Sequence, residues 1–354
     1  MAALRRGGED AASRLILLLI VLCVNEIAFA QCNLSAQGRN AAQTRVSSQS
    51  GKTGSKVGIT LNVITPDKKG DIWVGGAFFT LQGFLLRVGG EQIKPIILPE
   101  IKTTVHDLTF TTPKNGWMLA DYLYLYTTTD GGDNWHKAQL DQKQVLTDIF
   151  FSDSKHGWIV GWNGTIYHTN DGGSSWVKQE SGTALDLKKV MFVDSSHGWI
   201  IGGKTVGPTW RSVLLATDDG GKTWKTLTTD SQLSLRDFVF VDARQGWGLD
   251  FHNNILRTTN GGATWSVQRQ SDGTTIVSIF FFNEQEGLAI GNSILRTEDG
   301  GNTWSYQNDI NFDPEHVVFT DSMHGWAVQL KAGESPNLIR TNDGGLTWNM
   351  LSSG

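Results

Sequence analysis

Six copies of one octapeptide, T-x-[D/N]-G-G-x-x-W, divide most of this chain at nearly regular intervals. Segments with the composition of β-strands flank each copy, so each is expected to form the tip of a β-hairpin, where Gly-Gly supplies the positive φ angles of a tight turn. The side chain at the third position should accept hydrogen bonds from the backbone N–H groups of the turn. The six residues at this position are Asp130, Asp171, Asp219, Asn260, Asp299 and Asp343.

The octapeptide resembles the Asp-box, also called the bacterial neuraminidase repeat. Its closing tryptophans are 41, 48, 41, 39 and 44 residues apart, and repeats of about 40 to 50 residues are typical of β-propeller blades. Because the carboxylate is needed to cap the turn, we interpret the boxes as structural and not as metal ligands or catalytic acids. The boxes therefore predict a fold but not a ligand.

A second column of large residues defines seven repeat units. Its members are Trp73, Trp117, Trp158, Trp199, Trp247, Leu288 and Trp326. A typical unit has strand patterns at residues 145–151, 158–161, 165–169 and 176–179, which is the make-up of a four-stranded blade. We therefore predict an all-β, seven-bladed propeller over residues 57–354. Its first blade, residues 57–100, is degenerate because it lacks an Asp-box.

The first 56 residues are expected to lie outside the propeller. Residues 1–30 combine arginines, an apolar run at 15–24 and an Ala-Phe-Ala cleavage site, so they predict an export signal. An uncleaved membrane anchor is the alternative, although the apolar run is shorter than the roughly 20 residues that a span needs. Residues 31–56 are polar and predict a disordered tether. Cys32 would be the remaining thiol, and Gln31 before it is not the small residue that a lipoprotein site requires. The protein is then periplasmic, extracellular or membrane-associated.

Charge and motifs exclude several classes of function. The formal net charge of −5 argues against a nucleic-acid partner, and two cysteines do not make a disulfide framework. His156, His197 and His324 each precede Gly-Trp in a repeated turn, so a structural role is preferred to a metal site. No metal-binding or cofactor motif is found, and we expect a monomer without a cofactor.

The best candidate site lies at the start of the innermost strands, where polar residues should surround the mouth of a central channel. Blade by blade these pairs are Leu61-Asn62, His106-Asp107, Thr147-Asp148, Lys188-Lys189, Arg236-Asp237, Val277-Ser278 and Glu315-His316. Two insertions, at residues 203–212 and 331–337, are expected at the same end, where variable loops often carry function. Trp162 and Trp210 do not belong to a repeat column and are expected in loops there.

Four cations in this region could form one basic sector that binds a carboxylate-bearing partner. They are Lys188, Lys189, Arg211 and Arg236. The alternative is that these cations only offset Asp107, Asp148 and Asp237 around the ring.

The H-G-W-x-x-G element at Trp158 and Trp199, together with T-x-D-G-G-x-T-W at Trp224, resembles the photosystem II stability and assembly factor family. The resemblance covers units two to seven clearly and unit one loosely. It implies an exported, non-catalytic propeller that holds a membrane-protein subunit during assembly. The partner is then a protein or peptide.

Two other functions remain open. A sialidase-like glycosidase would need an early Arg-Ile-Pro motif and a Tyr-Glu nucleophile pair, but Arg87 lies in Leu-Arg-Val-Gly and no tyrosine is so paired. Arg257, Arg296 and Arg340 share one repeat position before their boxes and are expected on outer strands. An extracellular carbohydrate-binding or adhesion module would use Trp162 and Trp210 as stacking surfaces.

Overall fold

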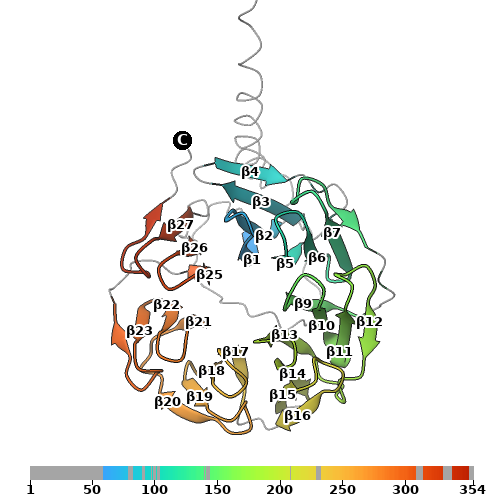
Figure 1. The fold of residues 1–354 in the computed structure, drawn as a ribbon. Coiled ribbons are helices and arrows are strands. Elements are labelled where there is room, and N and C mark those ends of the chain that lie inside the picture. The colour runs from blue at the N-terminus through green and yellow to red at the C-terminus, as the bar shows by residue number, and fades with distance from the viewer. Residues whose placement is uncertain are drawn as a thin grey trace, which may run out of the picture. The chain divides into compact units, whose positions relative to one another are not determined.

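The computed structural model describes residues 59–78, 83–89, 92–96, 98, 101, 104–138, 140, 144–207, 209–228, 233–307, 314–329 and 337–350. The predicted signal peptide, tether and Cys32 lie outside these residues, as does nearly all of the insertion at 331–337. Within them the chain forms seven four-stranded antiparallel sheets arranged as blades around a common centre (Figure 1). The all-β, seven-bladed propeller is therefore confirmed.

Each blade uses its first strand on the inside of the ring (Figure 1). These strands are β1 (Ile59–Pro66), β5 (Val105–Phe110), β9 (Leu146–Phe151), β13 (Leu187–Phe192), β17 (Leu235–Phe240), β21 (Ile276–Phe281) and β25 (Pro314–Phe319). The second strands are β2 (Ile72–Phe78), β6 (Gly116–Ala120), β10 (Gly157–Gly161), β14 (Gly198–Val206), β18 (Gly246–Asp250), β22 (Gly287–Gly291) and β26 (Gly325–Gln329).

The third and fourth strands follow outward. The third strands are β3 (Gly83–Gly89), β7 (Tyr124–Thr128), β11 (Thr165–Thr169), β15 (Thr209–Thr217), β19 (Ile255–Thr258), β23 (Ile294–Thr297) and β27 (Asn337–Thr341). The fourth strands are β4 (Gln92–Ile96), β8 (His136–Lys137), β12 (Val177–Gln179), β16 (Lys225–Thr228), β20 (Ser266–Arg269), β24 (Ser305–Tyr306) and β28 (Asn349–Met350). A short 3-10 turn, η2 (Trp162–Gly164), links β10 to β11.

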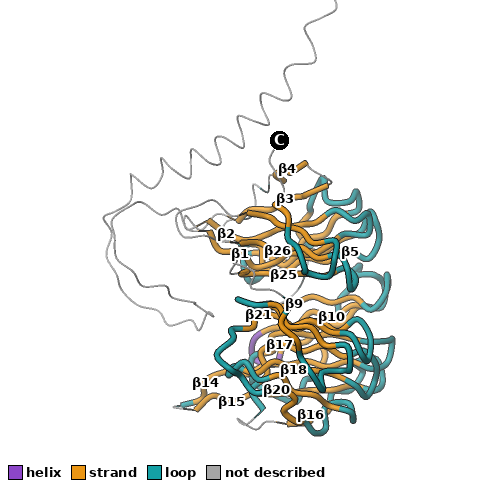
Figure 2. The backbone as a smooth tube through the Cα atoms, turned by 90° about the vertical axis from the view of Figure 1, so that its left-hand side faces the viewer, coloured by secondary structure: helices purple, strands orange, loops and turns teal. Residues whose placement is uncertain are grey.

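The first insertion departs from the prediction of a loop. Residues 203–212 extend the β14–β15 hairpin, with Val206 pairing with Thr209 and Thr205 pairing with Trp210. Gly207 turns the chain with a φ of +63°. β-branched residues favour the extended conformation, so the added residues continue the ladder. Figure 2 shows this hairpin reaching past the neighbouring strands.

Each Asp-box closes its hairpin through two side chains. In the second box, Thr169 Oγ1 donates to Asp171 Oδ1 at 2.7 Å and accepts from the Gly173 N–H at 2.8 Å. Asp171 Oδ1 also accepts from the Ser175 N–H at 2.9 Å. In the fourth box, Asn260 Oδ1 accepts the equivalent bond from the Thr264 N–H at 3.0 Å. The boxes thus cap their own turns, and the buried threonine is as central as the carboxylate.

The blades are joined by a repeated contact of three aromatic rings. The column tryptophan of one blade stacks on the phenylalanine that ends the next blade's first strand, as Trp158 does on Phe192 at 3.7 Å between ring centroids. The box tryptophan of that next blade meets the same phenylalanine edge-on, as Trp224 does at 5.8 Å. Such edge-to-face pairs add to the energy of burial. Each triad therefore links two consecutive blades.

Glycines allow these rings to approach the backbone. A Cβ on Gly198 would lie 2.5 Å from the Phe192 ring, its cross-strand neighbour. A Cβ on Gly221, which has a φ of +78°, would lie 2.5 Å from Trp158 Nε1. The Gly-Trp and Gly-Gly dipeptides of the repeat are therefore required by packing as well as by turn geometry.

We predict that Phe192→Ala lowers the free energy of unfolding by about 3–5 kcal/mol, because it removes the central ring of one triad. Chemical denaturation of the variant and parent would measure this loss. The control is Phe251→Ala, since Phe251 is 47% exposed and its loss should cost less than about 1 kcal/mol. Equal effects of the two variants would contradict the proposed importance of the triad.

We predict that Thr169→Val lowers stability by about 1–2 kcal/mol, because the half-buried Gly173 N–H loses its acceptor at almost unchanged side-chain volume. Asp171→Asn is the control and should be nearly neutral at pH 7, since Asn260 already serves in another box. Thermal unfolding measures both changes. A larger loss in Asp171→Asn than in Thr169→Val would assign the turn's stability to the carboxylate charge.

Candidate functional site

Five polar side chains from consecutive blades form a cluster on the inner edge of the ring, which we call the inner-ring cluster. Its members are Asp107, Asp148, Lys189, Asp237 and Ser278. Each follows a register shift between the first and second strands of its blade, as between Leu187 and Lys189. A bulge adds one residue to the strand and redirects side chains, so the same break recurs where each blade presents a polar group.

The carboxylates of this cluster connect each blade to a following one. Asp107 Oδ2 accepts the Ile149 N–H at 2.8 Å, and Asp148 Oδ2 accepts the Val190 N–H at 2.6 Å. Asp237 Oδ2 accepts the Ile279 N–H at 3.1 Å. Each acceptor satisfies an amide next to a bulge, where the ladder leaves it unpaired. The structural role of these carboxylates is therefore to join one blade to a following one.

Asp107 and Asp148 are hydrogen-bonded to each other. Burial raises the pKa of Asp107 well above its usual range, and the negative charge of Asp148 raises it further. Burial also raises the pKa of Asp148, against the lowering effect of bonds from Asp107 and the Val190 N–H. Two adjacent carboxylates resist losing both protons, because both would then be negatively charged. The pair therefore keeps one proton at pH values above the usual pKa of aspartate.

Lys189 is engaged by an acid of the same cluster. Its Nζ bonds to Asp237 Oδ1, and its side chain is 39% exposed. Burial lowers the pKa of Lys189, but the charges of Asp237 and Asp148 raise it by more, so the ammonium is held in its charged form. A carboxylate-bearing ligand would have to compete with Asp237 for this group.

Arg236 is also committed within the propeller. Its Nε donates to the Asp250 carbonyl at 3.1 Å, and its Nη2 donates to Asn253 Oδ1 at 2.7 Å and to the Ile276 carbonyl. The last bond reaches the first strand of the next blade. Lys189 thus offsets Asp237, as the alternative expects, whereas Arg236 bonds to carbonyl and amide oxygens and to none of the three aspartates. Two of the four predicted cations are engaged within the propeller, and the basic sector stays a prediction.

The other predicted binding residues are not members of the inner-ring cluster. Lys188 is exposed, and burial of part of its side chain lowers its pKa while Asp186 raises it. Arg211 is exposed on β15, opposite Lys204 in the extended hairpin. Trp162 is 40% exposed on η2. Trp210 belongs to β15, not to a loop, and its side chain lies outside the described residues.

The repeated histidines serve their turns. The Nδ1 atoms of His156, His197 and His324 lie 2.8–3.1 Å from carboxylate oxygens three residues earlier in the chain. Those carboxylates also accept backbone N–H bonds of the same turns, as Asp153 does from His156. In the described part of the chain, no three His, Cys, Asp or Glu side chains gather as a metal ion would require.

The arginine column occupies third strands, as expected, with Arg257 on β19, Arg296 on β23 and Arg340 on β27. Arg257 stacks over Trp247 at 5.3 Å and donates to Gln245. These arginines are spread over three blades and do not converge on one carboxylate.

Three features escaped the sequence-based prediction. These are the box threonine, which bonds within its own turn, and the Asp107–Asp148 pair and the phenylalanine column, which depend on contacts between neighbouring repeats. A signal for the column was present, because six first strands end in Phe six residues before Gly. No sequence signal marks the carboxyl pair, since an aspartate at the start of a first strand is as compatible with a solvent-exposed channel mouth as with a buried pair.

The fold and its boxes define a seven-bladed Asp-box propeller with a polar inner ring. A model of the family described as photosynthesis system II assembly factor YCF48 matches residues 134–236 and 224–311, together half of the chain. The chain therefore belongs to this family. No curated protein matches the sequence.

Solved structures share the fold at low sequence identity. YCF48 bound to a D1 peptide is 17% identical with a TM-score of 0.63, over 80% of this chain and 92% of that one. YCF48 from Cyanidioschyzon merolae is 18% identical with a TM-score of 0.60, over 81% and 96%. An inactive virginiamycin B lyase from Staphylococcus aureus is 14% identical with a TM-score of 0.58, over 77% and 92%. The fold alone therefore does not separate binding proteins from enzymes.

We predict that Asp148→Asn stabilises the protein at pH 8. The folded pair holds a proton that the unfolded chain has released, so its contribution to stability falls as the pH rises above about 4. Each unit by which the folded pKa exceeds the unfolded one corresponds to about 1.4 kcal/mol. Asparagine keeps the acceptor for the Val190 N–H and removes the like charge.

Thermal unfolding of the variant and the parent from about pH 4.5 to about pH 8 is the appropriate measurement, because the pair loses its contribution between the unfolded and the folded pKa. His106, whose pKa burial lowers to about 4, contributes the same slope to both proteins and cancels in their difference. The variant should gain stability over the parent as the pH rises. A difference that is constant with pH would show that the pair does not share a proton.

Proposed function

We propose that this protein is an exported, non-catalytic propeller that binds a polypeptide partner and acts as a scaffold in the assembly of a membrane-protein complex. The family match over residues 134–311 carries the proposal. A related propeller, YCF48, has been solved with a D1 peptide, so a peptide of that kind is the first candidate partner. Export rests on the signal peptide predicted for residues 1–30. In the described residues, no helix has the length and apolar character needed to cross a membrane.

The inner-ring cluster supports binding over catalysis. Its carboxylates are bonded to backbone amides of a following blade, and its ammonium is bonded to Asp237. A general acid or nucleophile needs an oxygen that can reach a substrate. The carboxylates and the ammonium of the inner-ring cluster join neighbouring blades, which gives a rigid surface on which a partner can dock.

We expect the full chain to bind a D1 peptide saturably in a calorimetric titration, and a scrambled peptide of the same composition not to bind. Arg211→Glu should weaken binding to an acidic peptide without lowering the melting temperature, because Arg211 is exposed on the β14–β15 hairpin. Equal binding of the two peptides, or none in a normally folded protein, would contradict D1 as the partner.

A carbohydrate-binding role is the second candidate, and the exposed ring of Trp162 favours it. The neighbouring Asn163 has a φ of +54°, and its side chain is bonded to Gln144 and Lys204. This places polar groups beside an exposed indole, the usual composition of a sugar-stacking surface. Glycan-array binding that is lost in Trp162→Ala would establish this function in place of the assembly role.

A further inference from the structure

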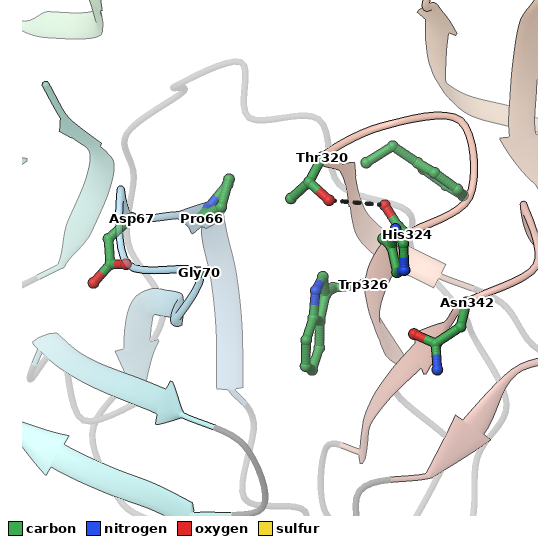
Figure 3. A pocket seen from close by; sticks show the side chains of 8 residues that line it. Pro66, Asp67, Gly70, Thr320, His324, Trp326 and Asn342 are labelled. Carbon is green, nitrogen blue, oxygen red and sulfur yellow. Dashed lines mark hydrogen bonds between the residues drawn. The ribbon is translucent and has the colours of Figure 1, made fainter. Parts of the chain in front are cut away.

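A cavity of about 490 Å³ lies at the seam where the seventh blade meets the first. Its lining residues are Pro66, Asp67, Gly70, Phe319, Thr320, His324, Trp326 and Asn342. Figure 3 shows Trp326 and His324 on one side and the turn between β1 and β2 on the other. The cavity therefore separates the last and first repeats of the ring.

The corresponding position at the other interfaces is filled by the chain itself. Five column tryptophans stack on the phenylalanine of the next blade at 3.5 to 5.2 Å, and Leu288 packs with Phe319 in the same way. The next blade's Asp-box covers the indole, so that a Cβ on Gly132 would lie 2.3 Å from Trp73. As a result these six column residues are only 0–4% exposed.

The first blade supplies neither of these elements to Trp326. Its first strand ends in Pro66, where the other six first strands end in Phe. The sequence between β3 and β4 has no Asp-box. Trp326 is accordingly partly exposed, and it makes no ring-to-ring contact with the described residues. One face of this indole lacks the partner that its equivalents have.

Polar groups surround the exposed indole. His324 Nδ1 is bonded to the Asp321 carboxylate, which leaves Nε2 on the outer side of the ring. The exposed Asn342 amide has no hydrogen-bond partner among the described residues. Asp67 instead turns its carboxylate away from Trp326 (Figure 3) and accepts from Trp73 Nε1 at 3.1 Å. The cavity thus combines an aromatic floor with an amide and an imidazole that can bond to a peptide backbone.

We propose that the seam cavity binds an aromatic side chain of a partner polypeptide, whose ring stacks on Trp326 where the other interfaces use their own phenylalanine. The repeat itself defines this ligand, because six equivalent positions show which group fits against the column residue. Outside the described residues the sequence has three phenylalanines: Phe29 in the predicted signal peptide, Phe79 and Phe312. In the proposal the stacking ring comes from another chain, and a ring supplied by Phe79 or Phe312 instead would appear as a large loss of stability in Trp326→Ala. The inference rests on the proposed function in taking the partner to be a polypeptide.

Two variants test the cavity. Trp326→Ala removes the stacking surface, and Pro66→Phe restores the residue of the other six blades and so fills the space. The probe is the blocked peptide Gly-Ser-Phe-Ser-Gly, with Gly-Ser-Leu-Ser-Gly as its control, observed by saturation-transfer NMR on the full chain. We expect transfer to the Phe ring protons in the parent, at least a fivefold loss in both variants, and retention in Trp162→Ala. Unchanged transfer in Trp326→Ala, or equal transfer to the Leu peptide, would overturn the proposal.

Stability measurements separate binding from folding. Trp326→Ala should melt close to the parent because its indole is partly exposed, whereas Trp247→Ala at the equivalent buried position should melt well below it. Pro66→Phe should raise the melting temperature. A Trp326-dependent dimer in sedimentation would assign the cavity to a second copy and overturn the proposal. A D1 peptide that still binds Trp326→Ala with full affinity would keep the proposed function and remove the cavity from it.

Discussion

The contact between one blade's column tryptophan and the next blade's phenylalanine is the interaction on which this ring depends. A four-stranded sheet has two faces to bury, and here each face is covered only by a neighbouring blade. The stacked ring fills the space between two sheets, and the box tryptophan closes it from the outside. This arrangement explains why glycine precedes the tryptophan and why the second glycine of a box such as Gly221 is needed, since a Cβ at either place would strike a ring. A Cβ on the first glycine, as on Gly220, would meet a backbone carbonyl oxygen.

On the inside of the propeller, the polar side chains of the inner-ring cluster join neighbouring blades in addition to the aromatic triads. The aspartates of the inner-ring cluster accept amides of a following blade at the bulges, where the ladder of their own sheet is interrupted. The like charges that this creates are reduced by a shared proton at Asp107–Asp148 and by Lys189 beside Asp237. Charged residues at the centre of the ring therefore reflect the requirements of closure. They are a poor guide to ligand chemistry.

Among the described residues, the seam between the last and first blades lacks the contact between a column tryptophan and a phenylalanine. Without a phenylalanine at the end of β1 and without a box after β3, the chain leaves Trp326 partly uncovered and a cavity beside it. Six well-filled interfaces keep the ring rigid, so one open interface can persist. A rigid scaffold with one incomplete interface suits a protein that binds another polypeptide, because the binding position is formed before the partner arrives.

The sequence by itself determined the number of blades, the hairpins and the structural role of the boxes. These follow from local patterns: Gly-Gly fixes a turn, alternation fixes a strand, and the repeat length fixes a blade. It also located the polar start of the first strands, including Asp107, Asp148 and Lys189.

Only the tertiary structure decided how those residues are used. Whether Lys189 and Arg236 are available depends on Asp237 and on the Ile276 carbonyl, which lie about 40 to 50 residues away along the chain. The extension of the β14–β15 hairpin and the cavity beside Trp326 likewise depend on pairing and on what the neighbouring blade provides. Local propensity acts within one repeat, whereas partners, exposure and pKa values are set between repeats, and only the closed ring brings those repeats together.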